Sequence, residues 1–247
     1  MKVGDILLIG RYGVNEDAEL ARIAWIKATP ASDFITKFVI DLLKYDEDEP
    51  GGEFNCIGNP DYDKSNILQF LNSIGAKDEW FKPTHVLDMA PGTAINAWRN
   101  NGGYSAHSGF LHYFEEHELE ALCGTVGLPR RADIFGPRGQ QFKYFERHGI
   151  RANPSNDLVR NKYGHGYDFG SFVPYFTRDV NSNGKEVFTI DRVGGTGHQY
   201  ASNASGIRPV CSVRDDAKVV ARDSGAYELL YSPIVYQQQD FRTFFGI

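Results

Sequence analysis

The sequence predicts an α+β fold, and three observations lead to this prediction. Residues 167–213 alternate β-favouring runs with turn and glycine signals, the pattern of a hairpin followed by a loop and a closing strand. Residues 63–75 place apolar side chains at helical spacing behind a capping residue. Aromatic residues make up 13% of the chain, which favours a sheet core rich in rings.

Composition limits the classes of function. The 247-residue chain is 41% hydrophobic and 23% charged, as in a globular protein that buries a sizeable core. Its net charge is −6 and it has no basic block, so we expect no nucleic-acid binding. The first apolar run is too short for a secretory signal, and no run has the length of a membrane span. We therefore expect no signal peptide and no membrane insertion.

The first half of the chain predicts strands and one clear helix. Residues 3–13 and 20–29 have the pattern of strands, and residues 34–43 fit either a strand or a short helix. The acidic run 46–49 is expected to be a solvent-exposed loop. A helix is expected to begin at Asp63 or Ser65 and to end at Gly75. Its buried stripe is predicted to be Ile67, Phe70, Leu71 and Ile74.

The middle of the chain predicts short helices separated by loops. Helices are expected at residues 115–122 and 128–136. A further one is expected at 140–148, with Phe142 and Phe145 directed inward. The polar segments 92–109 and 150–166 are predicted to be loops or irregular structure.

The last third predicts a hairpin, a closing strand and a C-terminal extension. Strands are expected at residues 172–176, 187–190 and 206–213, with an Asn-Ser-Asn-Gly turn at 181–184 and a flexible glycine loop from Gly194. The region 214–224 is expected to be turn-like and 226–236 to form a strand pair broken by Pro233.

We expect one domain over residues 1–215 and an extension over 216–247. Three phenylalanines near the end of the extension require a partner surface. They are Phe241, Phe244 and Phe245. The extension is therefore a candidate for anchoring or for homo-oligomer formation.

Several sequence motifs occur in the order found in an uncharacterised domain family of bacteriophages and prophages of Firmicutes. They are VGDILLIGRYG (3–13), IAWIKA (23–28), GNPDYDKSNILQFLNS (58–73), WFKPTH (80–85), SGFLHYFEEHELEAL (108–122), LPRRADIFG (128–136) and SGIRPVCSV (205–213). The chain resembles this family over residues 1–215. The resemblance implies a C-type-lectin-like fold of the formylglycine-generating-enzyme type. Such a fold has a twisted antiparallel sheet, two or more flanking helices and long loops. The family has no established chemistry to transfer.

The sequence favours neither of two conceivable metal sites, so no cofactor is expected. Asp179, Asn181 and Asn183 match the start of a calcium loop, but Ile190 occupies the position of the required Glu. A hairpin turn is the favoured interpretation. Formylglycine-generating enzymes bind copper through two close cysteines, whereas only Cys211 lies in the corresponding region. Cys56, Cys123 and Cys211 contain no C-x-x-C pair and are expected to be small core residues.

Two loops have the rings, amides and glycines of adaptable recognition surfaces. Tyr163, His165 and Tyr167 belong to the first loop. His198, Tyr200 and Asn203 belong to the second. Both loops flank the central hairpin, so this fold would allow them to lie near each other. The alternative is that they are ordinary loops with their rings packed inward.

The expected function is that of a non-enzymatic bacteriophage virion protein. It would be synthesised in the host cytoplasm and displayed on the particle, as capsid decoration or as a tail or baseplate component. Other virion proteins and further copies of the chain are the expected partners. The main alternative is an adhesin that recognises a host-surface glycan or protein through the loop aromatics. A copper-dependent oxidase is a remote alternative.

Overall fold

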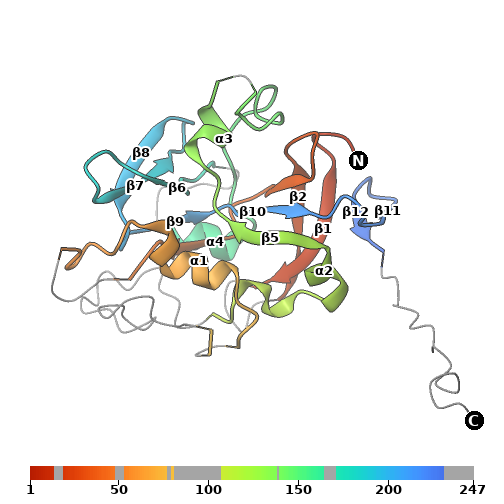
Figure 1. Ribbon diagram of the computed structural model, residues 1–247, viewed down its shortest axis with the longest axis horizontal. Helices are drawn as coiled ribbons and strands as arrows, with labels where there is room; N and C mark the ends of the chain where they lie inside the picture. The colour runs from red at the N-terminus through yellow and green to blue at the C-terminus, as the bar shows by residue number, and fades with distance from the viewer. Residues whose placement is uncertain are drawn as a thin grey trace, which may run out of the picture.

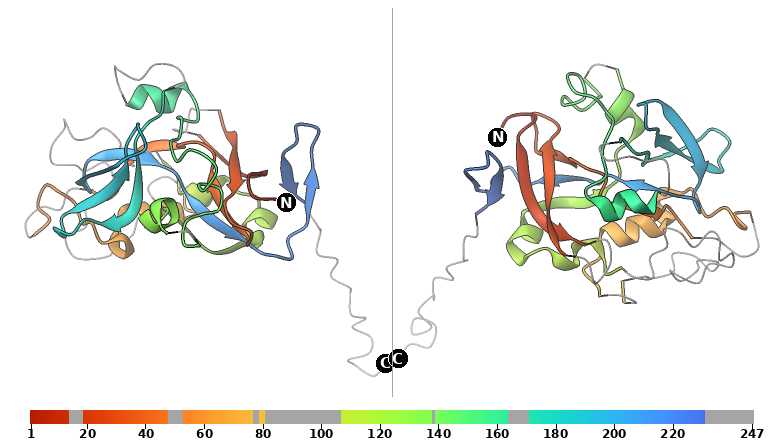
Figure 2. Two further views of the ribbon diagram at one scale, coloured as in Figure 1. Left: turned by 90° about the horizontal axis from the view of Figure 1, so that it is seen from above. Right: turned by 180° about the vertical axis from the view of Figure 1, so that it is seen from behind.

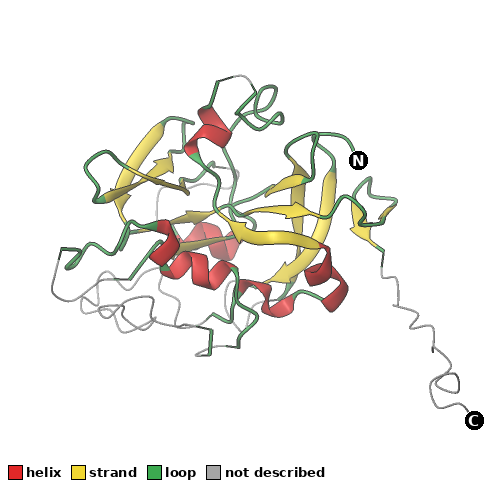
Figure 3. Cartoon of the chain, viewed as in Figure 1, coloured by secondary structure: helices red, strands yellow, loops and turns green. Residues whose placement is uncertain are grey.

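The structure is a computed structural model that describes residues 1–13, 19–47, 53–76, 79–80, 107–137, 139–163 and 171–230. These residues form an α+β structure in which strands predominate and the helices are short (Figure 1, Figure 3), which confirms the predicted fold class. Within this part of the chain, no helix has the length and apolar character needed to cross a membrane.

The strands divide between two sheets instead of forming one antiparallel sheet. The first sheet has the order β11-β12-β1-β2-β3-β10-β5 and the second β4-β9-β6-β7-β8. The strands of the first sheet are β1 (Ile6–Tyr12), β2 (Ala21–Lys27), β3 (Asp33–Thr36), β5 (Leu122–Gly127), β10 (Val210–Val213), β11 (Val219–Ala221) and β12 (Tyr227–Leu229). Those of the second are β4 (Asp41–Lys44), β6 (Tyr175–Val180), β7 (Glu186–Ile190), β8 (Thr196–Tyr200) and β9 (Ala204–Ile207). The pairs β1–β12 and β6–β9 are parallel, and the other described pairs are antiparallel.

Two segments of the chain pass from one sheet to the other. β3 pairs with β10 in the first sheet, and β4 pairs with β9 in the second. Between them, Thr36 N donates to Pro209 O (2.9 Å) and Ile40 N to Ile207 O (3.0 Å). The expected strand 206–213 is thus two strands joined at a bend. The segment 34–43 is likewise two strands, and β4 is buried along its whole length, which explains its apolar pattern at both periods.

Arg208 fills the bend between the sheets. It is 1% exposed, and its Nε donates to Thr36 O (2.9 Å) while Nη1 donates to Ile150 O (3.1 Å). Its guanidinium lies 5.3 Å from the ring centroids of Phe145 and Tyr175. No carboxylate of the described residues forms an ion pair with it. Arg208, at the centre of the SGIRPVCSV motif, is therefore a buried cation that is stabilised by carbonyl oxygens and aromatic rings.

Six aromatic side chains form the centre of the larger core cluster, as the aromatic content predicted. Their neighbouring ring centroids lie 5.3–6.3 Å apart, in tilted or edge-to-face contacts. They are Tyr12, Trp25, Phe70, Trp80, Phe110 and Phe114. These rings join β1 and β2 to the helical segments beside the sheet.

The helices are short and most lie where they were predicted. They are α1 (Asn66–Leu71), α2 (Glu116–Ala121), α3 (Arg131–Phe135) and α4 (Asp157–Lys162), with 3-10 turns at Tyr62–Lys64 and Phe110–Tyr113. Ser65 caps α1, since its Oγ accepts a hydrogen bond from Leu68 N (3.3 Å). The helix ends before Asn72, whose Nδ2 donates to Leu68 O and Val126 O. Ile74 was therefore wrongly placed in the buried stripe, and it is 64% exposed.

Two helix predictions were wrong in opposite directions. Residues 140–148 form turns, although Phe142 and Phe145 are buried as expected. The segment 150–166 was expected to be irregular, yet it contains α4, which Asn156 caps by accepting from Val159 N (2.9 Å). Val159 is the only fully buried residue of α4, so this helix has too narrow an apolar stripe to be recognised from periodicity.

The acidic run 46–49 is not the solvent-exposed loop that was predicted, as far as it is described. Asp46 and Glu47 are each 1% exposed. Asp46 accepts hydrogen bonds from Asn59 N (2.8 Å) and Asn66 N (2.9 Å). Glu47 forms an ion pair of 2.6 Å with the buried Lys44. These carboxylates are tolerated in the interior because each has donors of its own.

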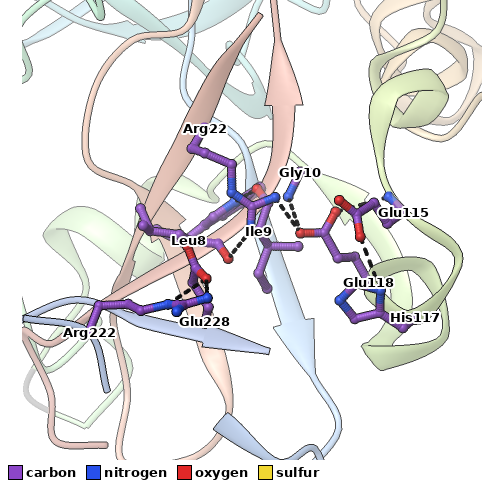
Figure 4. A network of polar contacts seen from close by, with 10 residues as sticks. Leu8, Ile9, Gly10, Arg22, Glu115, His117, Glu118, Arg222 and Glu228 are labelled. Carbon is purple, nitrogen blue, oxygen red and sulfur yellow. Dashed lines mark hydrogen bonds and ion pairs between the residues drawn. The ribbon is translucent and has the colours of Figure 1, made fainter. Parts of the chain in front are cut away.

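A buried carboxylate on α2 holds the bulge in β1 (Figure 4). The β1–β2 register shifts between Leu8 and Arg11, and Gly10 in the bulge has φ +67°. Glu118 Oε1 accepts from Gly10 N (3.0 Å) and from Arg22 Nη1 (2.7 Å). Arg22 Nη2 in turn donates to Leu8 O (3.0 Å). Helix, bulge and β2 are thereby fixed to one another.

The first part of the expected C-terminal extension belongs to the first sheet. β12 pairs in parallel with β1, and Leu229 lies in the larger core cluster. Figure 2 shows β11 and β12 at the edge of this sheet, beside the N-terminus. The expected strand pair at 226–236 is described only as far as residue 230, where it includes β12. Phe241, Phe244 and Phe245 lie outside the described residues.

Candidate functional site

The candidate site is a pocket between α3 and the outer face of the second sheet. Figure 1 shows α3 beside β6 and β7. The pocket has a volume of about 390 Å³, within the usual range for sites that bind small molecules. Its lining residues are Arg131, Ala132, Phe135, Gly136, Asp179, Val180 and Phe188.

Strand alternation in β7 directs two side chains toward this face. Val187 and Thr189 are buried on one face of β7, whereas on the other face Glu186 and Phe188 are half-buried and Ile190, at the end of the strand, is buried. In the antiparallel ladder, Glu186 lies opposite Tyr200 and Phe188 opposite His198. Directly opposed residues project to the same side of a sheet. His198 and Tyr200, on the edge strand β8, therefore project to the same face of the sheet as Phe188, which lines the pocket.

Arg131 supplies a positive charge to the pocket wall. Its guanidinium lies over the Phe188 ring, 5.0 Å from the centroid, and its backbone N donates to the Asp179 carboxylate. No acidic side chain in the described part of the chain forms an ion pair with this guanidinium. Phe135 and Val180 are 40% and 38% exposed. The pocket thus combines an unneutralised cation with apolar walls and one carboxylate.

A polar cluster orders the hairpin tip next to the pocket. Glu186 Oε2 accepts from Asn183 Nδ2 (2.6 Å) and lies 2.9 Å from His198 Nδ1. Desolvation opposes ionisation of Glu186, but the hydrogen bonds from Asn183 and His198 outweigh it and lower the pKa of this carboxyl. The ionised Glu186 keeps the His198 ring in place at the rim.

The segment that resembles a calcium loop is the β6–β7 hairpin turn, so the favoured interpretation is confirmed. Gly184 has φ +69°, as this turn requires. Asn181 Oδ1 accepts from Ser182 N (2.7 Å) and Asn183 Oδ1 from Lys185 N (2.9 Å). Among the residues that the structure describes, no group of three or more His, Cys, Asp or Glu side chains could hold a metal ion.

The six predicted recognition residues have different places in the structure. His198 and Tyr200 lie on β8, which is a strand where a loop was predicted, and Asn203 lies in the exposed turn that follows. Tyr163 follows α4, and its hydroxyl donates to Pro174 O (2.8 Å), so it helps to pack the second sheet. His165 and Tyr167 lie outside the described residues.

Sequence reasoning missed Arg131, Phe135 and Phe188 as site residues. Arg131 and Phe135 belong to a helix that was predicted from its Pro and apolar pattern, and Phe188 to the predicted returning strand. Nothing in their local pattern indicates that helix and strand meet. The exposure of Arg131 and Phe135, which the structure reveals and the sequence does not, is what distinguishes them.

A buried polar cluster around Asp41 is the second candidate, and its contacts favour a structural role. Asp41 is fully buried and accepts from Tyr12 Oη (2.7 Å), Leu42 N (2.7 Å) and Lys162 Nζ (2.6 Å). His107 Nε2 lies 2.9 Å from its Oδ2. Four donors occupy the four acceptor positions of a carboxylate. Asp41 therefore joins β1, β4, α4 and His107 and keeps no acceptor position for a substrate.

The cysteines do not share one environment. Cys211 is buried, as predicted, and burial raises the pKa of its thiol. Cys56 is half-buried with φ +61°, and Cys123 is exposed, so the prediction of a core position was wrong for both. Cys123 lies opposite Ser212 on the neighbouring strand, which places its side chain on the other face of the sheet from Cys211. The sheet separates the two thiols that a copper pair would require.

Comparisons with protein-family models, with curated proteins and with solved structures found no match for this chain.

Proposed function

We propose that this chain is a non-enzymatic binding protein, displayed on a bacteriophage particle, whose fold is C-type-lectin-like. The sequence motifs in residues 1–215 that resemble the phage family support the phage assignment. The outer face of β7 and β8 supports the binding assignment, because it presents Tyr200 and His198 beside an open pocket to which α3 contributes Arg131, a cation with no ion pair in the described residues. Rings fixed to a strand and a guanidinium supported by the Phe188 ring have limited freedom, so ordering them on binding costs little entropy.

The expected macromolecular partners are components of the phage particle. The C-terminal extension would bind other virion proteins or further copies of this chain, and its candidate contact residues are Phe241, Phe244 and Phe245. Capsid decoration and a tail or baseplate position both fit a protein that exposes one face for binding. If the outer face of β7 and β8 contacts the host surface, the protein acts as an adhesin.

The decisive test is the composition of purified particles. Mass spectrometry and cryo-electron microscopy of phage particles should find this chain. Hundreds of copies per particle would assign it to the capsid surface, and a few to a few dozen copies to the tail. Absence of the chain from particles would contradict the virion assignment.

Binding by the β7–β8 face is tested with the purified protein. Tyr200→Ala should abolish retention on host cells, since it removes an exposed ring without disturbing the core. Leu158→Ala is the control, because Leu158 is also exposed (48%) but lies on α4. Equal retention of the two variants would show that this face does not bind the cell.

A further inference from the structure

We infer that the pocket between α3 and β7 binds an acidic sugar unit, a hydroxylated ring that carries one carboxylate, as in the uronic acid residues of polysaccharides. This inference rests on the proposed function, because it names the ligand class of the same face. Three features of the pocket support it: the hydrogen-bond donors of the Arg131 guanidinium, the acceptor oxygen of Asp179 and the exposed apolar walls.

Arg131 is prepared to bind a carboxylate. Its guanidinium lies over the Phe188 ring at 5.0 Å, and this contact with the ring consumes none of its N–H donors. The exposed side chain has no ion pair in the described residues, so binding an anion does not first require breaking one. A planar guanidinium binds a carboxylate through two parallel hydrogen bonds. The aromatic support limits the rotamer freedom that binding would otherwise remove.

Asp179 restricts which anion fits. One of its oxygens accepts from Arg131 N, and its Oδ1 has no hydrogen-bond donor in the described residues. A sugar hydroxyl can donate to that oxygen. The Asp179 charge repels any anion in proportion to the anion's charge, so it opposes a phosphate dianion about twice as strongly as a carboxylate. The pair of one cation and one carboxylate therefore favours a ligand with a single negative charge and several hydroxyl donors.

The apolar walls match the remaining surface of a sugar ring. Phe135 and Val180 are 40% and 38% exposed at the pocket, and the C–H face of a sugar ring covers such surface when it binds. The volume of about 390 Å³ lies within the range of sites for small ligands. His198 and Tyr200 continue the same face at the rim, where neighbouring units of a polysaccharide would lie.

The test is calorimetric titration of the full chain with tetragalacturonate, with the neutral tetragalactose as the matched ligand and inorganic phosphate as a competitor. Wild-type protein should bind tetragalacturonate and bind tetragalactose about tenfold more weakly or not at all. Phosphate at equal concentration should not displace the sugar. Absence of tetragalacturonate binding, equal binding of the neutral sugar, or displacement by phosphate would overturn the inference.

Variants assign the binding to the pocket. Arg131→Gln should weaken tetragalacturonate binding by about tenfold or more, and Arg131→Lys by less, because an ammonium keeps the charge but loses the planar fork. Arg130→Gln is the control, since this neighbouring arginine is exposed and does not line the pocket. Equal affinities of Arg131→Gln and Arg130→Gln would overturn the assignment. A chain that is present in particles but binds no uronate would refute this inference alone, whereas absence from particles would refute the proposed function.

Discussion

Arg208 and Asp41 are charged side chains in the interior, and different groups satisfy them. Arg208 is surrounded by carbonyl oxygens and aromatic faces, whereas Asp41 is surrounded by a hydroxyl, an amide, an imidazole and an ammonium group. Each one connects elements that are distant in the chain. The cost of removing either side chain is therefore set by the partners left without a hydrogen bond.

Arg208→Met should lower the free energy of unfolding by about 2 kcal/mol, because Thr36 O loses the Arg208 donor inside the bend and an unsatisfied buried carbonyl costs about 1–3 kcal/mol, whereas Ile150 O still accepts from Tyr175 Oη (2.7 Å). Urea denaturation followed by circular dichroism measures this change. Arg214→Gln is the control, since it removes an exposed ion pair with Asp216 and should leave the midpoint unchanged. A decrease in the free energy of unfolding no larger than that of the control would show that the contacts of Phe145 and Tyr175 stabilise the bend without Arg208.

Asp41→Asn should lower the free energy of unfolding by about 3 kcal/mol near pH 7, because Lys162 loses its buried anion. Burial opposes ionisation of Asp41, but the hydrogen bond from His107 and the charge of Lys162 outweigh it and lower the pKa of this carboxyl. Its contribution is therefore complete above about pH 4, the unfolded value, and is lost as the pH falls through the lower folded value.

The difference between wild type and Asp41→Asn should accordingly shrink below about pH 4 when urea midpoints are compared across pH. Asp157→Asn is the matched control, because this carboxylate is 66% exposed in its ion pair with Arg160. A difference that is constant with pH would mean that Asp41 acts through its shape and not its charge.

At the scale of elements, short strands and helices are positioned by single contacts at their ends. The bulge in β1 turns the Gly10 amide toward Glu118 of α2. At the pocket, the α3 amide of Arg131 donates to Asp179 near the end of β6 and connects the helix to the strand. Elements of four to seven residues have little stability of their own, so these contacts decide where each element lies.

Gly10→Ala should destabilise the protein more than Gly184→Ala. Both glycines have positive φ, +67° and +69°, so an alanine at either position costs about 1–2 kcal/mol of backbone strain. A Cβ at Gly10 would also lie 2.3 Å from the Phe114 ring, whereas a Cβ at Gly184 meets no atom within 4 Å. Overpacking of this kind adds about 1–3 kcal/mol. Thermal unfolding of the two variants measures the difference, and equal midpoints would show that Phe114 moves aside freely.

At the scale of the whole molecule, the described part of the extension completes the first sheet. β12 covers the edge of β1 and contributes Leu229 to the core. The bent β3–β4 and β9–β10 segments belong to both sheets and join them through continuous backbone. The proposed binding face of β7 and β8 lies in the other sheet, away from this edge.

Two truncations separate folding from assembly. Removal of residues 237–247 should leave the unfolding midpoint unchanged, because β12 ends at Leu229, and should prevent incorporation into particles. Removal of 216–247 should lower the midpoint, because it uncovers β1 and takes Leu229 from the core. Thermal unfolding and particle incorporation are the two measurements. If the protein without residues 216–247 unfolds at the same midpoint as wild type, β11 and β12 are dispensable for stability. If the protein without residues 237–247 is still incorporated into particles, these last residues are not the anchor.

The sequence by itself determined the features that depend on near neighbours along the chain. The β6–β7 hairpin follows from the Asn-Ser-Asn-Gly turn, and α1 begins at Ser65 because a serine hydroxyl caps an amide three residues later. The α+β class and the aromatic core follow from the same local patterns.

Only the tertiary structure decided which of these elements meet. Burial of Asp46, the bend at Arg208 and the pocket between Arg131 and Phe188 each join residues that lie far apart in the sequence. Strand and helix periodicity reports which face of an element is buried but not against which partner. The candidate site could therefore be predicted only in part, as His198 and Tyr200 on the neighbouring strand, because Arg131 and Phe135 belong to a helix that only the tertiary fold brings to the strands.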